Sequence, residues 1–412
     1  MTEEGSWKQL FCHGDHMSEA YWGLEQNLKT TPLYKVHNDN RAKLVPFAGY
    51  YLPIQYENGI IAEHNHTRNS VSIFDVSHMG QIKISGPMIY DAMEKILPIS
   101  FSKIAPGQIK YTQFLNNEGK IIDDLMICRT FEEDHVWLVV NADCTSKDLD
   151  HLYNNLNKAY KIELIEDRAL IALQGPNSSN ILKTFFQEID DMPFMTADWF
   201  NYDNEKFFIS RCGYTGEDGF EISIKDRYAE KFINELLQCE GVKLAGLGAR
   251  NSLRMEAGLC LYGNDISSSV SPIEAGLTWS IPKERIENGG FIGHEPIKKD
   301  LENGVERKLV GIKPLGKLPA REGTQIFDKN EKTIGEITSG GYSPSLQTPI
   351  AMGYINSDIL KSECEVLLNV RGNLIPAEIT SLPFVEHKYF SCLLYTSPSP
   401  RDMRRSRMPS SA

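Results

Sequence analysis

The sequence predicts an α+β protein whose C-terminal part is a small all-β domain. Up to residue 300, stretches with strand-like alternation are followed by stretches with helical spacing, but without the regular rhythm of a parallel α/β fold. From Glu306 onward, short apolar stretches recur between turn-forming residues, as in a small barrel or sandwich. We therefore expect an α+β body over residues 30–300 and a β domain over residues 301–390.

The first elements of the body follow from local patterns. Gln81–Gly86 alternates apolar and polar residues as a half-buried strand does, and Met88–Pro98 after it has helical spacing. His135–Ala142 is a nearly all-apolar strand. It leads into a helix that we expect Asp143 or Thr145 to cap.

The later part of the body continues in the same way. Ala169–Pro176 and Phe207–Ile224 indicate strands, the second folded as a hairpin around Gly213–Gly219. Arg227–Gln238 has apolar residues at i, i+4 spacing and indicates an amphipathic helix.

Composition bounds the function. With 412 residues, the chain is too long to fold around a single hydrophobic core, which suggests two or three domains. Its hydrophobic fraction of 41% is typical of a globular protein. Its net charge of −12 argues against nucleic-acid binding and against anionic membrane surfaces. No run approaches the roughly 18 apolar residues that cross a bilayer, so no membrane span is expected.

Metal and disulfide chemistry are not indicated. None of the eight cysteines forms a CxxC pair, which favours reduced thiols. Cys12, His13 and His16 resemble metal ligands but lack a fourth ligand nearby. A second group, His64, His66 and His78, is better explained as polar surface histidines. We expect no metal at either group.

Both ends of the chain differ from the middle. Residues 1–29 hold five acidic residues, no Arg and no apolar h-region, so we expect an unstructured extension rather than a secretory or mitochondrial leader. Residues 391–412 contain Ser/Pro repeats and four Arg without a packing pattern. We expect this tail to be non-native or unstructured.

A strand with two adjacent acids is the most unusual feature of the body. Asp123 and Asp124 follow a turn and lie inside an apolar run, Ile121–Ile127. Because strand side chains alternate between faces, the two acids occupy different environments. A buried unpaired carboxylate costs several kcal/mol or stays protonated, so this strand needs an explanation.

Two further polar clusters occur within apolar stretches. A solvated hairpin tip would explain Glu217 and Asp218, but it would not explain Glu221 between two apolar residues. Arg250 and Arg254 share one helix face. They could pair with surface carboxylates or form a fork that binds a carboxylate ligand.

Ten motifs in order resemble the aminomethyltransferase family, the T-proteins of the glycine cleavage system, over residues 30–390. The motifs are FAGYYLPIQY, FDVSHMGQIKISG, GKIIDDLMI, LVVNA, ALQGP, SRCGYTGEDGFEISI, GARNSLRMEAGLCLYGNDI, SPIEAGLTWSI, IGEITSGGYSPSL and LPFVEHKYF. The resemblance implies a three-lobed cloverleaf, in which two α+β lobes with ferredoxin-like elements and a C-terminal β-barrel surround tetrahydrofolate. It also implies an activity: the methylene carbon of aminomethyl-lipoyl H-protein passes to tetrahydrofolate, giving 5,10-methylene-tetrahydrofolate, ammonia and dihydrolipoyl H-protein.

Matching positions imply the site residues. Asp124 matches the family's essential carboxylate, which stabilises developing positive charge or handles a proton, and Asp123 becomes a structural group on the other face. The implied folate and substrate pocket consists of Met79, Tyr111, Asn141, Tyr214, Glu221, Arg250 and Tyr389. The sequence departs from the family pattern at Cys128, Asn251 and Leu259.

The resemblance also leaves two alternative functions open and implies binding partners and a cellular compartment. The alternatives are another folate-dependent demethylase of this fold and a non-catalytic folate-binding protein for iron–sulfur assembly. The partners are lipoylated H-protein and tetrahydrofolate. The basic stretch Glu306–Arg321, with five basic residues against one acidic, is a candidate docking surface for H-protein and equally a solvated barrel edge. We expect a cytoplasmic enzyme of bacterial type, or a mitochondrial matrix enzyme in a eukaryote.

Overall fold

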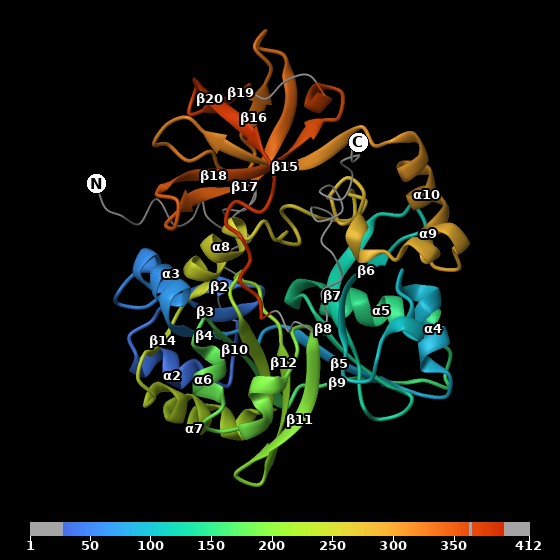
Figure 1. Ribbon diagram of the computed structural model, residues 1–412, viewed down its shortest axis with the longest axis vertical. Coiled ribbons are helices and arrows are strands. Elements are labelled where there is room, and N and C mark those ends of the chain that lie inside the picture. The colour runs from blue at the N-terminus through green and yellow to red at the C-terminus, as the bar shows by residue number, and fades with distance from the viewer. Residues whose placement is uncertain (1–27, 362–364, 391–412) are drawn as a thin grey trace, which may run out of the picture.

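The computed structural model describes residues 28–361 and 365–390, so most of the expected extension and the whole tail lie outside the described residues. Figure 1 shows a barrel at the top, a large sheet with its helices at the lower left and a second sheet at the lower right. The sheets have six and five strands, a three-stranded sheet flanks the first, and the barrel is closed with six. The α+β class and the C-terminal β-barrel are confirmed. Within the described ranges, no helix is long and apolar enough to cross a membrane.

The six-stranded sheet is antiparallel except where β14 runs parallel to β4. Its strand order is β11-β12-β13-β10-β4-β14. The strands of this sheet and of its three-stranded neighbour are β4 (Val71–Asp75), β10 (Arg168–Gln174), β11 (Thr196–Tyr202), β12 (Glu205–Arg211), β13 (Gly219–Lys225), β14 (Val242–Leu244), β1 (Lys29–Thr30), β2 (Lys43–Phe47) and β3 (Tyr50–Gln55). The helical segments of this lobe are α2 (Tyr34–Asp39), α3 (Ile60–Asn69), α6 (Ser178–Leu182), η5 (Gln187–Asp191), α7 (Asp226–Leu237) and α8 (Leu247–Glu256).

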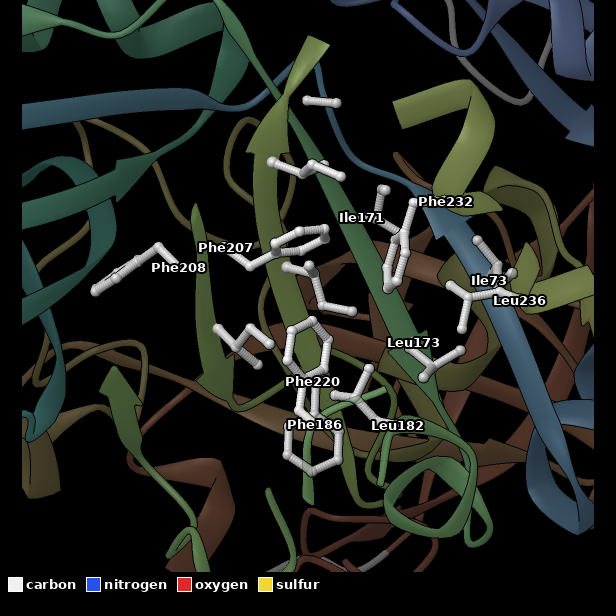
Figure 2. Close-up of a cluster of buried hydrophobic side chains, with 14 of the residues drawn as sticks. Ile73, Ile171, Leu173, Leu182, Phe186, Phe207, Phe208, Phe220, Phe232 and Leu236 are labelled. Carbon is white, nitrogen blue, oxygen red and sulfur yellow. The ribbon is translucent and has the colours of Figure 1, made fainter. Parts of the chain in front are cut away.

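The largest hydrophobic cluster lies between this sheet and α7. The helix buries Ala229, Phe232, Ile233 and Leu236, which share one stripe at i, i+3, i+4 and i+7. Figure 2 shows the cluster, with Phe232 and Leu236 beside the side chains of the strands. Every residue of β10 is buried because helices or loops cover both faces of this central strand. The predicted hairpin and amphipathic helix are thus present.

The five-stranded sheet is inserted between two neighbouring strands of the first. The chain leaves the large sheet after β4, builds β5 to β9 in the order β6-β7-β8-β5-β9, and returns as β10. The two lobes are therefore interleaved along the sequence. Its elements are β5 (Gly80–Ser85), α4 (Ile89–Ile96), η3 (Phe101–Lys103), β6 (Ile109–Leu115), β7 (Ile121–Arg129), β8 (His135–Val140), η4 (Ala142–Cys144), α5 (Thr145–Asn155) and β9 (Lys161–Leu164).

The expected cap of α5 is wrong. The residue before the helix is Cys144, and no side chain caps its first turn. Thr145 instead donates its hydroxyl to the carbonyl oxygen of Asn141, at 3.2 Å. The helix is preceded by a 3₁₀ turn, which leads the chain from β8 into the helix without a capping side chain.

The barrel is joined to the body by buried charges on α8. Arg254 is 2% exposed; its Nη1 donates to Asp265 Oδ2 at 2.6 Å and its Nη2 to Ser339 Oγ in the barrel at 2.8 Å. Arg254 is therefore held by an ion pair and does not form a free fork with Arg250. The barrel and the segment before it comprise η6 (Thr278–Ser280), α9 (Lys283–Asn288), α10 (His294–Asn303), β15 (Arg307–Pro314), β16 (Gln325–Phe327), β17 (Thr333–Ser343), β18 (Thr348–Asn356), η7 (Ile359–Lys361), β19 (Glu365–Val370) and β20 (Asn373–Thr380).

Candidate active site

A cavity of about 950 Å³ lies where the lobes meet, against the middle of β7, the length of α8 and the residues that follow β8. This volume is at the upper end of the range for small-molecule sites. Residues from both sheets, from α8 and from the segment after the barrel line it. All eight residues predicted for the site contribute to this lining, namely Met79, Tyr111, Asp124, Asn141, Tyr214, Glu221, Arg250 and Tyr389.

The adjacent acids face different environments, as strand alternation requires. Asp123 is fully buried beneath the sheet, whereas Asp124 is half-buried and lines the cavity. Asn141, just after β8, holds both: its Nδ2 donates to Asp123 Oδ1 and to Asp124 Oδ1, each at 2.9 Å. Its backbone N–H also donates to Asp123, at 3.1 Å. One amide therefore sets the positions of both carboxylates.

Tyr111 completes the hydrogen bonding of Asp124. Its hydroxyl donates to Asp124 Oδ2 at 2.9 Å, from the neighbouring strand β6. Burial and the charge of Asp123 nevertheless raise the pKa of Asp124 to about 7, and the hydrogen bonds from Tyr111 and Asn141 act in the opposite direction. A carboxyl group with this pKa can change its protonation state near neutral pH.

Aromatic faces form two walls of the cavity. The Tyr111 ring stacks on Trp279 with centroids 5.4 Å apart and planes 19° apart. Tyr389 stacks on Phe194 at 4.3 Å and 12°. Both pairs offer flat surfaces for a planar ligand. Trp279 was not predicted for the site, although it lies in the motif SPIEAGLTWSI, and it is 69% exposed in the structure.

Glu221 and Arg250 converge on the cavity from β13 and α8. Among the described residues no ion pair within 4.0 Å joins them. The Arg250 guanidinium lies 4.7 Å from the ring centroid of Tyr214, and its Nη1 atom is buried without a hydrogen-bond partner. Burial raises the pKa of Glu221, and the charge of Arg250 opposes that shift. Both charged groups thus keep hydrogen-bonding capacity for a ligand.

The expectation of surface histidines is wrong for two of the three. His64 is fully buried, and His78 is 6% exposed, lines the cavity and has an unpartnered Nδ1 atom. Burial lowers the pKa of His78 to about 4, so its ring is neutral at pH 7. In the described part of the chain, no group of three His, Cys, Asp or Glu side chains is arranged to hold a metal. Cys12, His13 and His16 lie outside the described residues.

The hairpin that carries Tyr214 is held by a buried glutamine rather than exposed to solvent. Gln174 donates to the Cys212 carbonyl at 3.0 Å and accepts from Thr215 at 2.8 Å. A Cβ atom on Gly213 would lie 1.9 Å from the Gln174 side chain, so glycine is required at this close approach.

The acids of this hairpin are also buried, which corrects the expectation of a solvated tip. Glu217 is 1% exposed and pairs with Arg68 at 3.1 Å, and Asp218 pairs with Arg211 at 2.6 Å. These pairs anchor the hairpin from both sides. The two acids are therefore structural members of the site's frame.

Two of the three departures from the family pattern line the cavity. Asn251 and Leu259 are part of the lining, whereas Cys128 is buried in the hydrophobic cluster of the large sheet. The first two are therefore placed to alter ligand packing, and Cys128 is not.

Comparisons with known proteins cover nearly the whole described chain. Residues 33–285 match the family described as GCVT N-terminal domain, and residues 307–386 match the glycine cleavage T-protein C-terminal barrel domain. The mitochondrial aminomethyltransferase of Dictyostelium discoideum is 40% identical over 390 residues, covering 90% of this chain and 96% of that protein. That of Pisum sativum is 40% identical over 395 residues, covering 93% and 96%. The structure of glycine cleavage system aminomethyltransferase T from Bartonella henselae matches with a TM-score of 0.84 and 39% identity, over 88% of this chain and all of that one.

Proposed function

The chain belongs to the glycine cleavage T-protein family and is an aminomethyltransferase, and from this premise we propose that Asp124 is its catalytic group and that the cavity binds tetrahydrofolate. The observation that carries the proposal is the position of Asp124. Its carboxylate lines the cavity and accepts two hydrogen bonds of 2.9 Å, one from Tyr111 on β6 and one from Asn141 just after β8.

A fixed carboxylate at this point suits the reaction. When the transferred carbon loses ammonia it becomes electron-poor, and a preorganised anion in a site of low polarity stabilises the developing positive charge. Because the pKa of Asp124 is near 7, the same group can also orient or accept a proton. Tyr111 and Asn141 hold the carboxylate in place and favour its ionised form.

The other residues of the cavity suit a folate. The aromatic pairs supply flat faces for the ring systems, while Asn141, Glu221 and Arg250 supply hydrogen-bonding groups at fixed positions. Unpartnered buried atoms of Arg250 and His78 indicate a polar ligand. We assign Met79 and Tyr214 to the lining of the same pocket, and Tyr389 to its wall.

The test compares Asp124→Asn with the wild type in the formation of 5,10-methylene-tetrahydrofolate from aminomethylated H-protein. Removing one electrostatic group in an active site costs about 10²- to 10³-fold in kcat, and we expect a loss of at least this size. Tetrahydrofolate binding, measured by fluorescence titration, should remain. Asp150→Asn is the control, because Asp150 is an exposed acid on the nearby helix α5.

Two outcomes would contradict the assignment. Activity that survives in Asp124→Asn would make the acid pair mainly structural and move the search to Glu221 and Arg250. A wild type that binds folate but forms no product would favour the non-catalytic folate-binding alternative.

For the partner, we propose that lipoylated H-protein docks on the basic stretch Glu306–Arg321. Lys308 and Lys317 are exposed, and Leu309, next to Lys308, lines the cavity. A positive patch beside the cavity can steer an acidic partner toward it, although the whole chain is acidic. Exposed Leu315 and Leu318 in the same stretch, 52% and 44% exposed, add apolar contact area.

Charge reversal tests this docking surface. Exchanging Lys308, Lys313 and Lys317 together for Glu should raise the KM for H-protein and leave tetrahydrofolate affinity unchanged. If both parameters stay at wild-type values, H-protein docks elsewhere. Reversal of Lys329, Lys332 and Arg371, which are exposed on the same barrel, is the matched control for total charge.

The compartment depends on the source. We expect the bacterial cytoplasm or the mitochondrial matrix. The curated relatives above are named as mitochondrial, and the similar solved structure is from a bacterium.

A further inference from the structure

Three cationic side chains, Lys147, Arg250 and Arg254, contribute to the lining of the cavity. The charges of two of them are balanced by acids of the protein. Arg254 pairs with Asp265 at 2.6 Å. Arg250 lies close enough to Glu221 for its charge to oppose the rise in the pKa of that acid. Lys147 is different, because it takes part in no ion pair with any residue that the structure describes.

Lys147 lies at an opening of the cavity. It belongs to α5, and it is exposed although it contributes to the lining. Its ammonium donates to the hydroxyl of Tyr262 at 2.8 Å and lies 4.5 Å from the centroid of that ring. Tyr262 is half-buried, lines the same cavity and comes from the segment that follows α8, 115 positions along the chain. The pair therefore joins two distant segments at the opening.

The pair keeps hydrogen-bond donors that no described residue uses. A lysine ammonium has three N–H groups, and Tyr262 engages one of those of Lys147. The Tyr262 hydroxyl accepts this bond, so its own O–H remains available. Within the described ranges neither group has another hydrogen-bond partner. A carboxylate has two acceptor oxygens, so it can accept from the ammonium and from the hydroxyl at the same time.

Asp143 is the acid that could compete for this ammonium. It is exposed, contributes to the lining and lies in the 3₁₀ turn that precedes α5. In the part of the chain that the structure describes, however, Asp143 forms no ion pair with Lys147. Burial alone raises the pKa of Asp143, whereas a close cation would lower it. The ammonium of Lys147 therefore stays available for a ligand.

Tetrahydrofolate has the matching chemistry at one end. Its ring system and aminobenzoate are flat, whereas its glutamate end carries two carboxylates that are ionised at neutral pH. Removing such charges from water without a cationic partner is costly, so this end belongs at an opening of the cavity and beside a cation. Arg250 is less suited, because a carboxylate bound there would also approach Glu221.

We propose that Lys147, together with the Tyr262 hydroxyl, binds a glutamate carboxylate of tetrahydrofolate and makes the enzyme selective for folates that carry glutamate. The inference rests on the proposed binding of tetrahydrofolate in the cavity. Lys147 is thus a specificity-determining residue and takes no part in the chemistry at Asp124. Because Lys147 is exposed, further glutamates attached to this end of the ligand extend into solvent and are tolerated.

The binding of two folates to Lys147→Met tests the proposal. Tetrahydropteroate has the ring system and the aminobenzoate of tetrahydrofolate but lacks glutamate. Loss of one partly exposed, charge-assisted contact should raise the Kd of tetrahydrofolate about five- to tenfold. The Kd of tetrahydropteroate should stay within about twofold of its wild-type value, because this ligand has no group that Lys147 binds. The wild type should bind tetrahydrofolate at least about fivefold more tightly than tetrahydropteroate.

Two further variants sharpen the comparison. Tyr262→Phe removes only the hydroxyl, so it should weaken tetrahydrofolate binding about two- to fivefold and leave tetrahydropteroate binding unchanged. Lys158→Met is the matched control, because Lys158 is exposed and does not contribute to the cavity lining. Higher salt should reduce the difference between the wild type and Lys147→Met, since ions screen an exposed charge pair.

The outcomes separate this inference from the proposed function. Equal weakening of both folates in Lys147→Met, or unchanged binding of tetrahydrofolate, would overturn the role of Lys147. A higher KM for H-protein with unchanged folate binding would also overturn it and place Lys147 in the contact with H-protein. A wild type that binds neither folate would instead refute the proposed folate cavity, whereas a wild type that binds both equally well would refute only the glutamate contact.

Discussion

Replacing Tyr111 by Phe should move the pH dependence of the reaction without removing the active site. The substitution deletes only the hydroxyl that donates to Asp124 Oδ2 at 2.9 Å. The ring that stacks on Trp279 remains, so the aromatic wall of the cavity is kept. The expected change is therefore confined to the ionisation of Asp124.

The size of the shift follows from the lost hydrogen bond. A hydrogen bond to a charged group contributes about 1.5–3 kcal/mol, and the lower figure applies here because Asp124 is partly exposed to the cavity. One pKa unit corresponds to about 1.4 kcal/mol, so the pKa of Asp124 should rise by about one unit. The ionised form is required, and the rate falls as pH falls through this pKa. The acid limb of kcat should therefore move from about pH 7 to about pH 8.

The assay is the pH profile of kcat for methylene-tetrahydrofolate formation under saturating substrates. At pH 7 the ionised fraction of Asp124 should be about one half in the wild type and about one tenth in Tyr111→Phe. The variant should therefore be about fivefold slower than the wild type at this pH. At pH 9 the two rates should agree within about twofold. Tyr153→Phe, an exposed tyrosine on α5 (58%), is the control. A midpoint that stays in place or moves to lower pH would refute the view that the rate reports the ionisation of Asp124.

Two stability predictions concern the frame around the site. Phe232→Ala removes a ring that is 2% exposed and packs against Phe207 with centroids 4.9 Å apart, so it should lower the free energy of unfolding by about 3–5 kcal/mol in urea titrations. Phe131→Ala, at a position 61% exposed, should change the free energy of unfolding by less than about 0.5 kcal/mol. Equal effects of the two substitutions would contradict the view that the buried cluster stabilises the fold. Burial opposes ionisation of Glu256, but hydrogen bonds led by that of His64 lower its pKa to about 2. Because the pKa of Glu256 is lower in the folded than in the unfolded state, its ionisation stabilises the fold at pH values above the unfolded pKa. The stability of the wild type should therefore fall as the pH drops from about 4.5 to 2. At pH 7 the free energy of unfolding of Glu256→Gln should be about 3 kcal/mol lower than that of the wild type, and it should change less as the pH falls. If the variant keeps the pH dependence of the wild type, other acids cause that dependence.

The elements recognised in the sequence are those that depend on local patterns. Strand alternation placed Asp123 and Asp124 on opposite faces, and the structure has one buried and one facing the cavity. Helical spacing identified α7, and turn residues identified the hairpin between β12 and β13. These signals come from neighbours within a few positions, where chain geometry alone decides which side chains share a face.

The sequence by itself thus determined the fold class, the β-rich C-terminal part and the strand with its two acids. Through the motifs that resemble a known family, it also indicated eight of the residues that line the cavity. Only the tertiary structure decided which charged groups are buried and which partners they have. Arg68 joins Glu217 and Glu256 across 149 and 188 positions, and Arg254 donates to Ser339 across 85 positions. The ionisation and role of such groups depend on desolvation and on contacts between distant segments, and no local pattern contains either.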